Sequence, residues 1–289
     1  MKKIKTEIII DKDVSTVWKV LISTRQLLSS LGTAFKMLSF RSLVLFFMLL
    51  YSGLGVGIIF TPYYCTYYFG FATQEMAVLP ISDAIGGFLS IGEQVSQKKI
   101  STISDAIGGF LSVLIAPNLG DKFGKKATTL WSGLIVGLAF TLPFHLRMLG
   151  FFPANGTTLL LPTYVLTLII AYTALMTAVS LVNSMMADVV DEFELQTGNR
   201  QEGLFFSMMS LSLKMTTGVG TFIAGLLLAW IEFPKQSDVA DVAPSIIDSL
   251  GWVGGPIVLG FFVLSVFFIL PYPISKARFR EIRVGFEKN

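Results

Sequence analysis

The sequence predicts an all-α membrane protein built around a six-helix transmembrane bundle. Of the 289 residues, 53% are hydrophobic and only 14% are charged, and the mean hydropathy is +0.70. Soluble domains carry nearer a quarter charged residues, so this composition excludes a soluble enzyme, a disordered chain and a secreted disulfide scaffold. Apolar stretches of about 20 residues, the length that crosses a bilayer, recur along the chain. We therefore expect membrane lipid as a partner. The 22 basic residues form no groove-binding stripe, so nucleic acid is not expected.

Five of the six spans are continuous apolar runs, at residues 40–69, 128–144, 158–185, 204–231 and 252–272. The second span is interrupted by a repeat, because ISDAIGGFLS occurs at 81–90 and again at 103–112. Removing one 22-residue unit joins 76–90 to 113–117 as one span of normal length. The insert IGEQVSQKKIST is too polar for hydrocarbon, so only one copy is expected within the membrane. The segment 81–112 is thus interpreted as a tandem duplication.

Basic residues divide unequally between the two ends of the predicted bundle. Of the 22 Lys and Arg, 17 lie in or beside the N-terminal tail, the 120–127 loop, the 188–203 loop and the C-terminal tail. Such asymmetry marks the cytoplasmic side of a membrane protein. We therefore expect a multi-pass protein of the plasma or inner membrane with both termini in the cytoplasm.

The first 34 residues differ in pattern from the rest of the chain. Residues 1–34 read as a short strand followed by an amphipathic helix from about Asp13, which we expect on a surface or skimming the membrane. Residues 35–289 form the predicted transmembrane domain.

Two connections at the basic end carry distinctive motifs. The loop after the second span reads LGDKFGKKAT, a short turn at Gly124 with basic residues around it. The connection after the fourth span reads MADVVDEFELQTGNRQEG. Its acidic residues have helical spacing, so we expect the helix to continue through Asp188, Asp191 and Glu192 and to break at Thr197 and Gly198. A solvated acidic loop would explain the charge but not this order of residues.

These motifs resemble those of known transporters. The first is similar to the loop between the second and third helices of each half of major facilitator transporters, although Pro117 stands where the leading Gly would fall. The second, with the following GLFFSMMSLSLKM and the closing YPISKARFREIR, resembles the glycoside-pentoside-hexuronide:cation symporters, the melibiose-permease-like branch. The resemblance covers only the C-terminal six of twelve helices. It implies one half of such a transporter, and a cytoplasmic gate formed by Asp121, Lys122, Lys125, Asp188, Asp191, Glu194, Thr197, Gly198, Arg200 and Glu202.

Lys214 is the strongest candidate for the substrate or cation pathway. It lies ten residues into the fifth span, about 15 Å deep and near the bilayer midplane. A charge at this depth should face a cavity or a carboxylate. The family resemblance likewise implies a lysine beside the cation and substrate region.

Thr177, Ser180 and Asn183 form a polar face on the fourth span, and we select Thr177 and Asn183 as further pathway candidates. Hydroxyl groups in membrane helices also bond to backbone carbonyls, which is the alternative interpretation. Tyr63, Tyr64, Tyr67 and Tyr68, at the outer end of the first span, are interpreted as an aromatic belt at the membrane interface.

The leading function is cation-coupled symport of a small polar, sugar-like solute, with Na⁺ or H⁺ as coupling ion, and not catalysis. Alternating access needs two halves around the site, so an N-terminal half or a second copy is the expected partner. The alternatives are an inactive fragment, a structural membrane protein, and a membrane prenyltransferase that holds Mg²⁺ at Asp188 and Asp191. The last would need a second Asp-rich cluster. No metal site and no organic cofactor are predicted.

Overall fold

The computed structural model describes residues 29–71, 103–234, 242–274 and 278–279. Its long elements, listed in chain order, are α2 (Leu38–Tyr63) continued by the π-helical η1 (Tyr64–Tyr68), α5 (Ile103–Phe123), α6 (Lys125–Met148), α7 (Leu160–Thr197), α8 (Glu202–Trp230), and a last span made of α9 (Pro244–Trp252), the π-helical η3 (Val253–Ile257) and α10 (Val258–Ile269). These elements confirm the all-α bundle. Within the described ranges, five segments are long and apolar enough to cross a membrane: α2 with η1, α6, α7, α8, and the last span. α5 does not meet this criterion.

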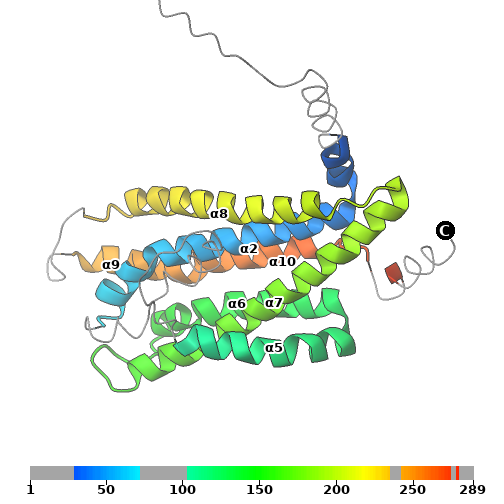
Figure 1. Cartoon of the computed structure of the whole chain (residues 1–289). Helices are drawn as coiled ribbons and strands as arrows, with labels where there is room; N and C mark the ends of the chain where they lie inside the picture. Colours follow the sequence, from blue (N-terminus) through cyan, green and yellow to red (C-terminus); the bar gives the residue numbers. More distant parts are fainter. Residues whose placement is uncertain (1–28, 72–102, 235–241, 275–277, 280–289) are drawn as a thin grey trace, which may run out of the picture.

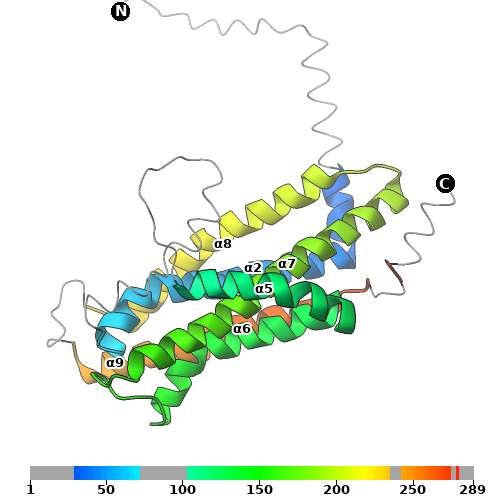
Figure 2. The same ribbon diagram turned by 60° about the horizontal axis from the view of Figure 1, so that its bottom comes forward.

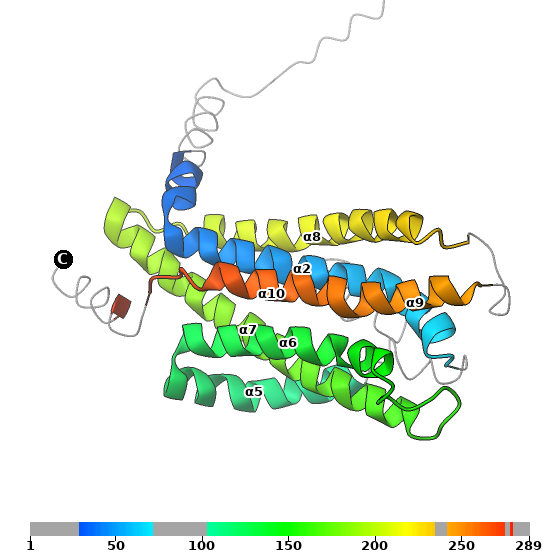
Figure 3. The same ribbon diagram turned by 180° about the vertical axis from the view of Figure 1, so that it is seen from behind.

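The helices run roughly parallel to one common axis and form a single bundle (Figure 1). α7 crosses the bundle obliquely and packs against both α5 and α6, while α10 packs against α2 and α6. α8 lies at one edge and makes most of its contacts with α2, as the view from behind also shows (Figure 3). Turning the molecule brings α5 to the front, with α8 set apart from it at the upper edge (Figure 2). As a result, α8 is much less buried than α2, α6 or α7.

The bundle uses glycines where helices approach closely. Gly133 and Gly137 of α6 face Val266 and Phe262 of α10, and Gly220 of α8 faces the backbone of Gly55 in α2. Small residues at such crossings allow backbone contact in membrane bundles.

The second span is built from the second copy of the repeat. α5 begins at Ile103, the first residue of that copy, and the first copy and the polar insert lie outside the described residues. Charged residues lie near both ends of α5, Asp105 close to its start and Asp121 and Lys122 in its last turn, which shortens its apolar run.

Gly108, within that second copy, holds α5 against α7. A Cβ atom here would lie 2.9 Å from the backbone nitrogen of Thr173, whereas one on Gly109 would have nothing within 4 Å. We expect Gly108→Ala to lower the melting temperature of the purified protein by several degrees, because the backbone of α7 must move. Gly109→Ala should leave it unchanged or raise it, since alanine favours the helix by about 1 kcal/mol. Equal effects of the two variants would contradict the close approach.

The helix ends bear on two expected features of the chain. Residues 29–36 are helical, and the helix is interrupted at Met37, which is extended (ψ 124°). The division between residues 34 and 35 stays a prediction. The predicted strand and amphipathic helix fall almost entirely in residues 1–28, outside the described residues. The helical extension after the fourth span is confirmed, because α7 continues to Thr197.

Candidate functional site

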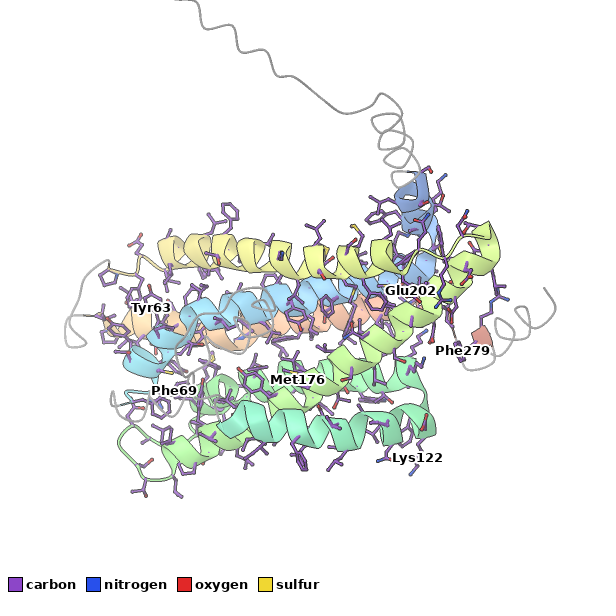
Figure 4. The ribbon with its side chains drawn as sticks, viewed as in Figure 1. Tyr63, Phe69, Lys122, Met176, Glu202 and Phe279 are labelled. Carbon is purple, nitrogen blue, oxygen red and sulfur yellow. The ribbon has the colours of Figure 1, made fainter. Side chains whose placement is uncertain are left out.

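The predicted gate residues gather at one end of the bundle, which we call the charged end. It comprises the α5–α6 turn, the part of α7 from Asp188 onward and the α7–α8 connection. Lys122, Glu202 and Phe279 lie at this end, whereas Tyr63 and Phe69 lie at the other and Met176 lies between (Figure 4).

Two glycines shape the turns at the charged end. Gly124 is the one residue between α5 and α6 and has φ +90°, and Gly198 ends α7 with φ +71°. Residues other than glycine adopt such positive φ values only at a cost in free energy. The amide of Gly198 donates to the carbonyl of Glu194 at 2.7 Å, and the Thr197 hydroxyl donates to the carbonyl of Phe193. The predicted break at Thr197 and Gly198 is therefore confirmed.

Asp188 and Lys125 form the buried ion pair of the charged end. The Lys125 ammonium lies 2.7 Å from both carboxylate oxygens of Asp188, which is 6% exposed. This pair joins the first turn of α6 to the start of the α7 extension. The ring of Phe279 lies 5.0 Å from the same ammonium.

The end of the last span docks beside this pair. Lys126 donates to the carbonyl of Tyr272 at 2.8 Å, and the Tyr272 hydroxyl donates to the carbonyl of Met185 at 3.3 Å. Burial, followed by the charges of Asp188 and Glu192, raises the pKa of Tyr272 well above its ordinary value. The hydroxyl therefore remains a proton donor, and α6, α7 and the chain after α10 are tied together.

Arg200 organises a second, exposed cluster. Its guanidinium lies 3.1 Å from Asp191, 2.7 Å from Glu194 and 2.8 Å from Glu202. Hydrogen bonds to Glu202 and Glu194 raise the pKa of Arg200 above its ordinary value, so it stays charged. This cluster closes the connection between α7 and α8. The acidic residues of α7 thus form ion pairs with two different cations, Lys125 and Arg200.

The remaining predicted gate residues lie around these clusters. Lys122 and Asp121 are exposed in the last turn of α5. Glu192, which the motif placed beside Asp188, accepts a hydrogen bond from the Ser39 hydroxyl at 2.6 Å and so joins α7 to the start of α2. The sequence had placed Lys126 at this end, within the 120–127 loop, but had not identified Ser39 or Tyr272 as contacts there.

The structure does not bring the three pathway candidates together. Lys214 is exposed, and Leu213 beside it lines a cleft. Thr177 is buried and donates to the carbonyl of Thr173 at 2.8 Å, the backbone interaction noted as its alternative. Asn183 is exposed. It lies seven residues, about two turns, beyond Met176 and on the same face of α7.

A cleft between α2 and α7 was not predicted, and we call it the tyrosine cleft. Its polar side chains are Tyr51, Thr61, Tyr64, Tyr164 and Tyr172, and its other lining residues are apolar or glycine. The cavity volume of the cleft is about 60 Å³. Tyr64 and Tyr68 are buried, so for these two the predicted belt at the membrane interface is wrong. Both continue the buried stripe of α2 that contains Val56 and Phe60 at intervals of four residues, so they face the bundle.

Long apolar helices with charged connections at one end are the features of a multi-pass integral membrane protein. A family model described as MFS/sugar transport protein matches residues 91–276, from the polar insert to just beyond the last span. The chain belongs to this family. The match contains the second copy of the repeat and not the first, in agreement with the copy that forms α5.

Three relatives are similar to this chain over part of its length. An uncharacterised symporter of Synechocystis sp. (strain ATCC 27184 / PCC 6803 / Kazusa) is 34% identical over 107 residues, 35% of this chain and 19% of that protein. A protein of Escherichia coli (strain K12) with the provisional name glycoside/cation symporter YagG is 31% identical over 100 residues, 34% of this chain and 21% of its own. The isoprimeverose transporter of Lactiplantibacillus pentosus is 28% identical over 164 residues, which are 57% of this chain and 32% of that protein. The matched segments thus span a fifth to a third of these relatives.

These findings confirm the resemblance to cation symporters and identify a transporter, not an enzyme. The geometry also disfavours the prenyltransferase alternative. Asp188 is paired with Lys125 and Asp191 with Arg200, so both carboxylates that would hold Mg²⁺ already face a cation.

Proposed function

We propose that these helices form one half of a cation-coupled symporter for a small, sugar-like solute. The observation that carries this is the family match, which runs through α5, α6, α7, α8 and the last span, together with relatives named as symporters or as a sugar transporter. Alternating access requires a second half facing the first, supplied by further polypeptide or by a second copy of this chain. Na⁺ or H⁺ would supply the driving force.

In this proposal the charged end and the middle of the bundle have different roles. The charged end is the cytoplasmic gate, because the buried Asp188–Lys125 pair and the Arg200 cluster tie α6, α7 and α8 where the basic residues concentrate. Lys214 faces the solute or cation pathway. Its exposure in this bundle supports that role, since a charge at mid-depth is costly unless a polar group or cavity receives it.

Orientation can be tested with single cysteines, since the native Cys65 is buried. We expect Glu232→Cys, at the end of α8 remote from the charged end, to react with a membrane-impermeant maleimide in intact cells. Lys122→Cys, in the last turn of α5, should react only after permeabilisation, because 17 of the 22 Lys and Arg place that end in the cytoplasm. The opposite labelling pattern would contradict the proposed topology.

Transport can be tested in proteoliposomes with isoprimeverose, the sugar named for one relative. This chain reconstituted with the N-terminal six helices of that relative should accumulate the sugar when a Na⁺ or H⁺ gradient is applied, and should not do so without a gradient. The chain alone should show no uptake. Gradient-driven uptake by the chain alone would show that a second copy supplies the other half, and no uptake by the pair would contradict the proposal.

A further inference from the structure

The tyrosine cleft contains a buried hydroxyl without a partner. Tyr64 is 3% exposed, and its hydroxyl makes no hydrogen bond to any group in the described part of the chain. A buried polar group in this condition is costly, and native structures rarely leave one unexplained. Tyr64 is one of the residues that line a cleft, so a molecule whose entry shifts the neighbouring side chains can supply the missing hydrogen bond.

The surroundings of Tyr64 define the chemistry of such a molecule. Tyr51, Tyr164 and Tyr172 contribute further rings, and none of the described residues that line the cleft carries a charge. A site of this kind suits a neutral ring with apolar faces and a few hydroxyl groups. The cavity volume of about 60 Å³ holds a few water molecules or one hydroxymethyl group but not a whole sugar ring.

We propose that Tyr64 anchors the hydroxymethyl group of a neutral pyranoside whose ring lies in the open part of the tyrosine cleft. This inference rests on the proposed transport function. It adds which residue binds the solute, Tyr64, and that the solute is uncharged. The cleft is lined by residues of α2 and α7 and by Leu213 of α8, the neighbour of Lys214. A carboxylate in place of the hydroxymethyl group would be buried without a cation among the residues that line the cleft, which disfavours a uronide.

The test uses the purified full chain and two probes that differ only at this group, methyl β-D-glucopyranoside and methyl β-D-glucuronide. The glucoside should raise the melting temperature by about 3–5 °C at ten times its dissociation constant. The glucuronide should give little or no shift. In Tyr64→Phe most of the glucoside shift should disappear, while the unliganded protein should melt at the same or a higher temperature because a buried unpaired hydroxyl is gone.

Tyr63→Phe is the matched control, because Tyr63 is the adjacent residue, packs on Phe233 and does not line the cleft. It should retain the full shift. If Tyr64→Phe does not fold, Gly57→Leu replaces it, since Gly57 lines the cleft and a Cβ atom there meets nothing within 4 Å. This variant should fold and lose the shift.

No glucoside shift in the native chain, or an undiminished shift in Tyr64→Phe or Gly57→Leu, would overturn the proposal, as would an equal shift from the glucuronide. A lower melting temperature for Tyr64→Phe with no glucoside shift in either protein would show that water holds the hydroxyl. Because binding is measured without a gradient or a second half, failure here is distinct from failure of the uptake experiment.

Discussion

Replacing Lys214 with methionine should lower gradient-driven uptake by the reconstituted pair roughly 30-fold or more. Loss of one partner of a desolvated charged contact costs about 2–5 kcal/mol, and 2 kcal/mol corresponds to that factor. Methionine keeps an unbranched side chain of nearly the same length and removes the ammonium group with its charge and hydrogen-bond donors. Initial rates of isoprimeverose uptake under a fixed gradient provide the measurement.

Two further variants make this result specific to the charge. Lys214→Arg should retain part of the activity. Ser210→Ala, one turn earlier on α8, should retain nearly all of it, because that exposed hydroxyl only donates to the carbonyl of Phe206. In the chain without a second half, Lys214→Met should instead improve membrane insertion, since an unpartnered lysine at mid-depth costs about 2.5–3.5 kcal/mol. Undiminished uptake by Lys214→Met would remove this residue from the pathway.

The helices and their ends were largely predictable from the sequence because those features depend on local physics. Hydropathy fixes which stretches lie in lipid, and Gly124 and Gly198 mark turns where positive φ is needed. The acidic pattern after Met185 was correctly interpreted as a continuation of the fourth helix through Asp188 to Thr197.

The faces of the helices were less predictable, because depth in a membrane says little about direction. Tyr64 and Tyr68 have the same hydropathy whether they face headgroups or a neighbouring helix, and in the structure both are buried. The partners of Asp188 and Glu192 also depend on tertiary contacts. Lys125 lies 63 residues and Ser39 lies 153 residues away in the chain, and no local pattern links them.

The repeat shows a different limit. The two copies are identical, so propensity within the ten residues cannot choose between them. What distinguishes them is the flanking sequence, since the second copy continues into VLIAP and the first into the polar insert. The helix that the structure describes is accordingly the one formed by the second copy, with Gly108 in contact with α7.

Asp188→Asn should lower the melting temperature of the purified chain by about 5–10 °C, while Arg200→Ala should lower it by no more than a few degrees. Removing one charge of a buried pair costs about 3–5 kcal/mol, and we expect the lower end because the Lys125 side chain is 34% exposed. Exposed pairs contribute about 0–1 kcal/mol and are screened by salt. Adding salt should therefore reduce the effect of Arg200→Ala and leave that of Asp188→Asn nearly unchanged.

A double-mutant cycle identifies the partner of Asp188. Lys125→Met should destabilise the protein alone, but in combination with Asp188→Asn the loss should be smaller than the sum of the single losses, because no unpaired charge remains. The exchanged pair, Lys125→Asp with Asp188→Lys, should recover part of the stability. Both ends of this pair lie where α6 and α7 meet, so the same cycle applied to uptake would show whether the contact also acts as a gate. Strictly additive losses in the melting temperature would mean that Asp188 is stabilised mainly by groups other than Lys125.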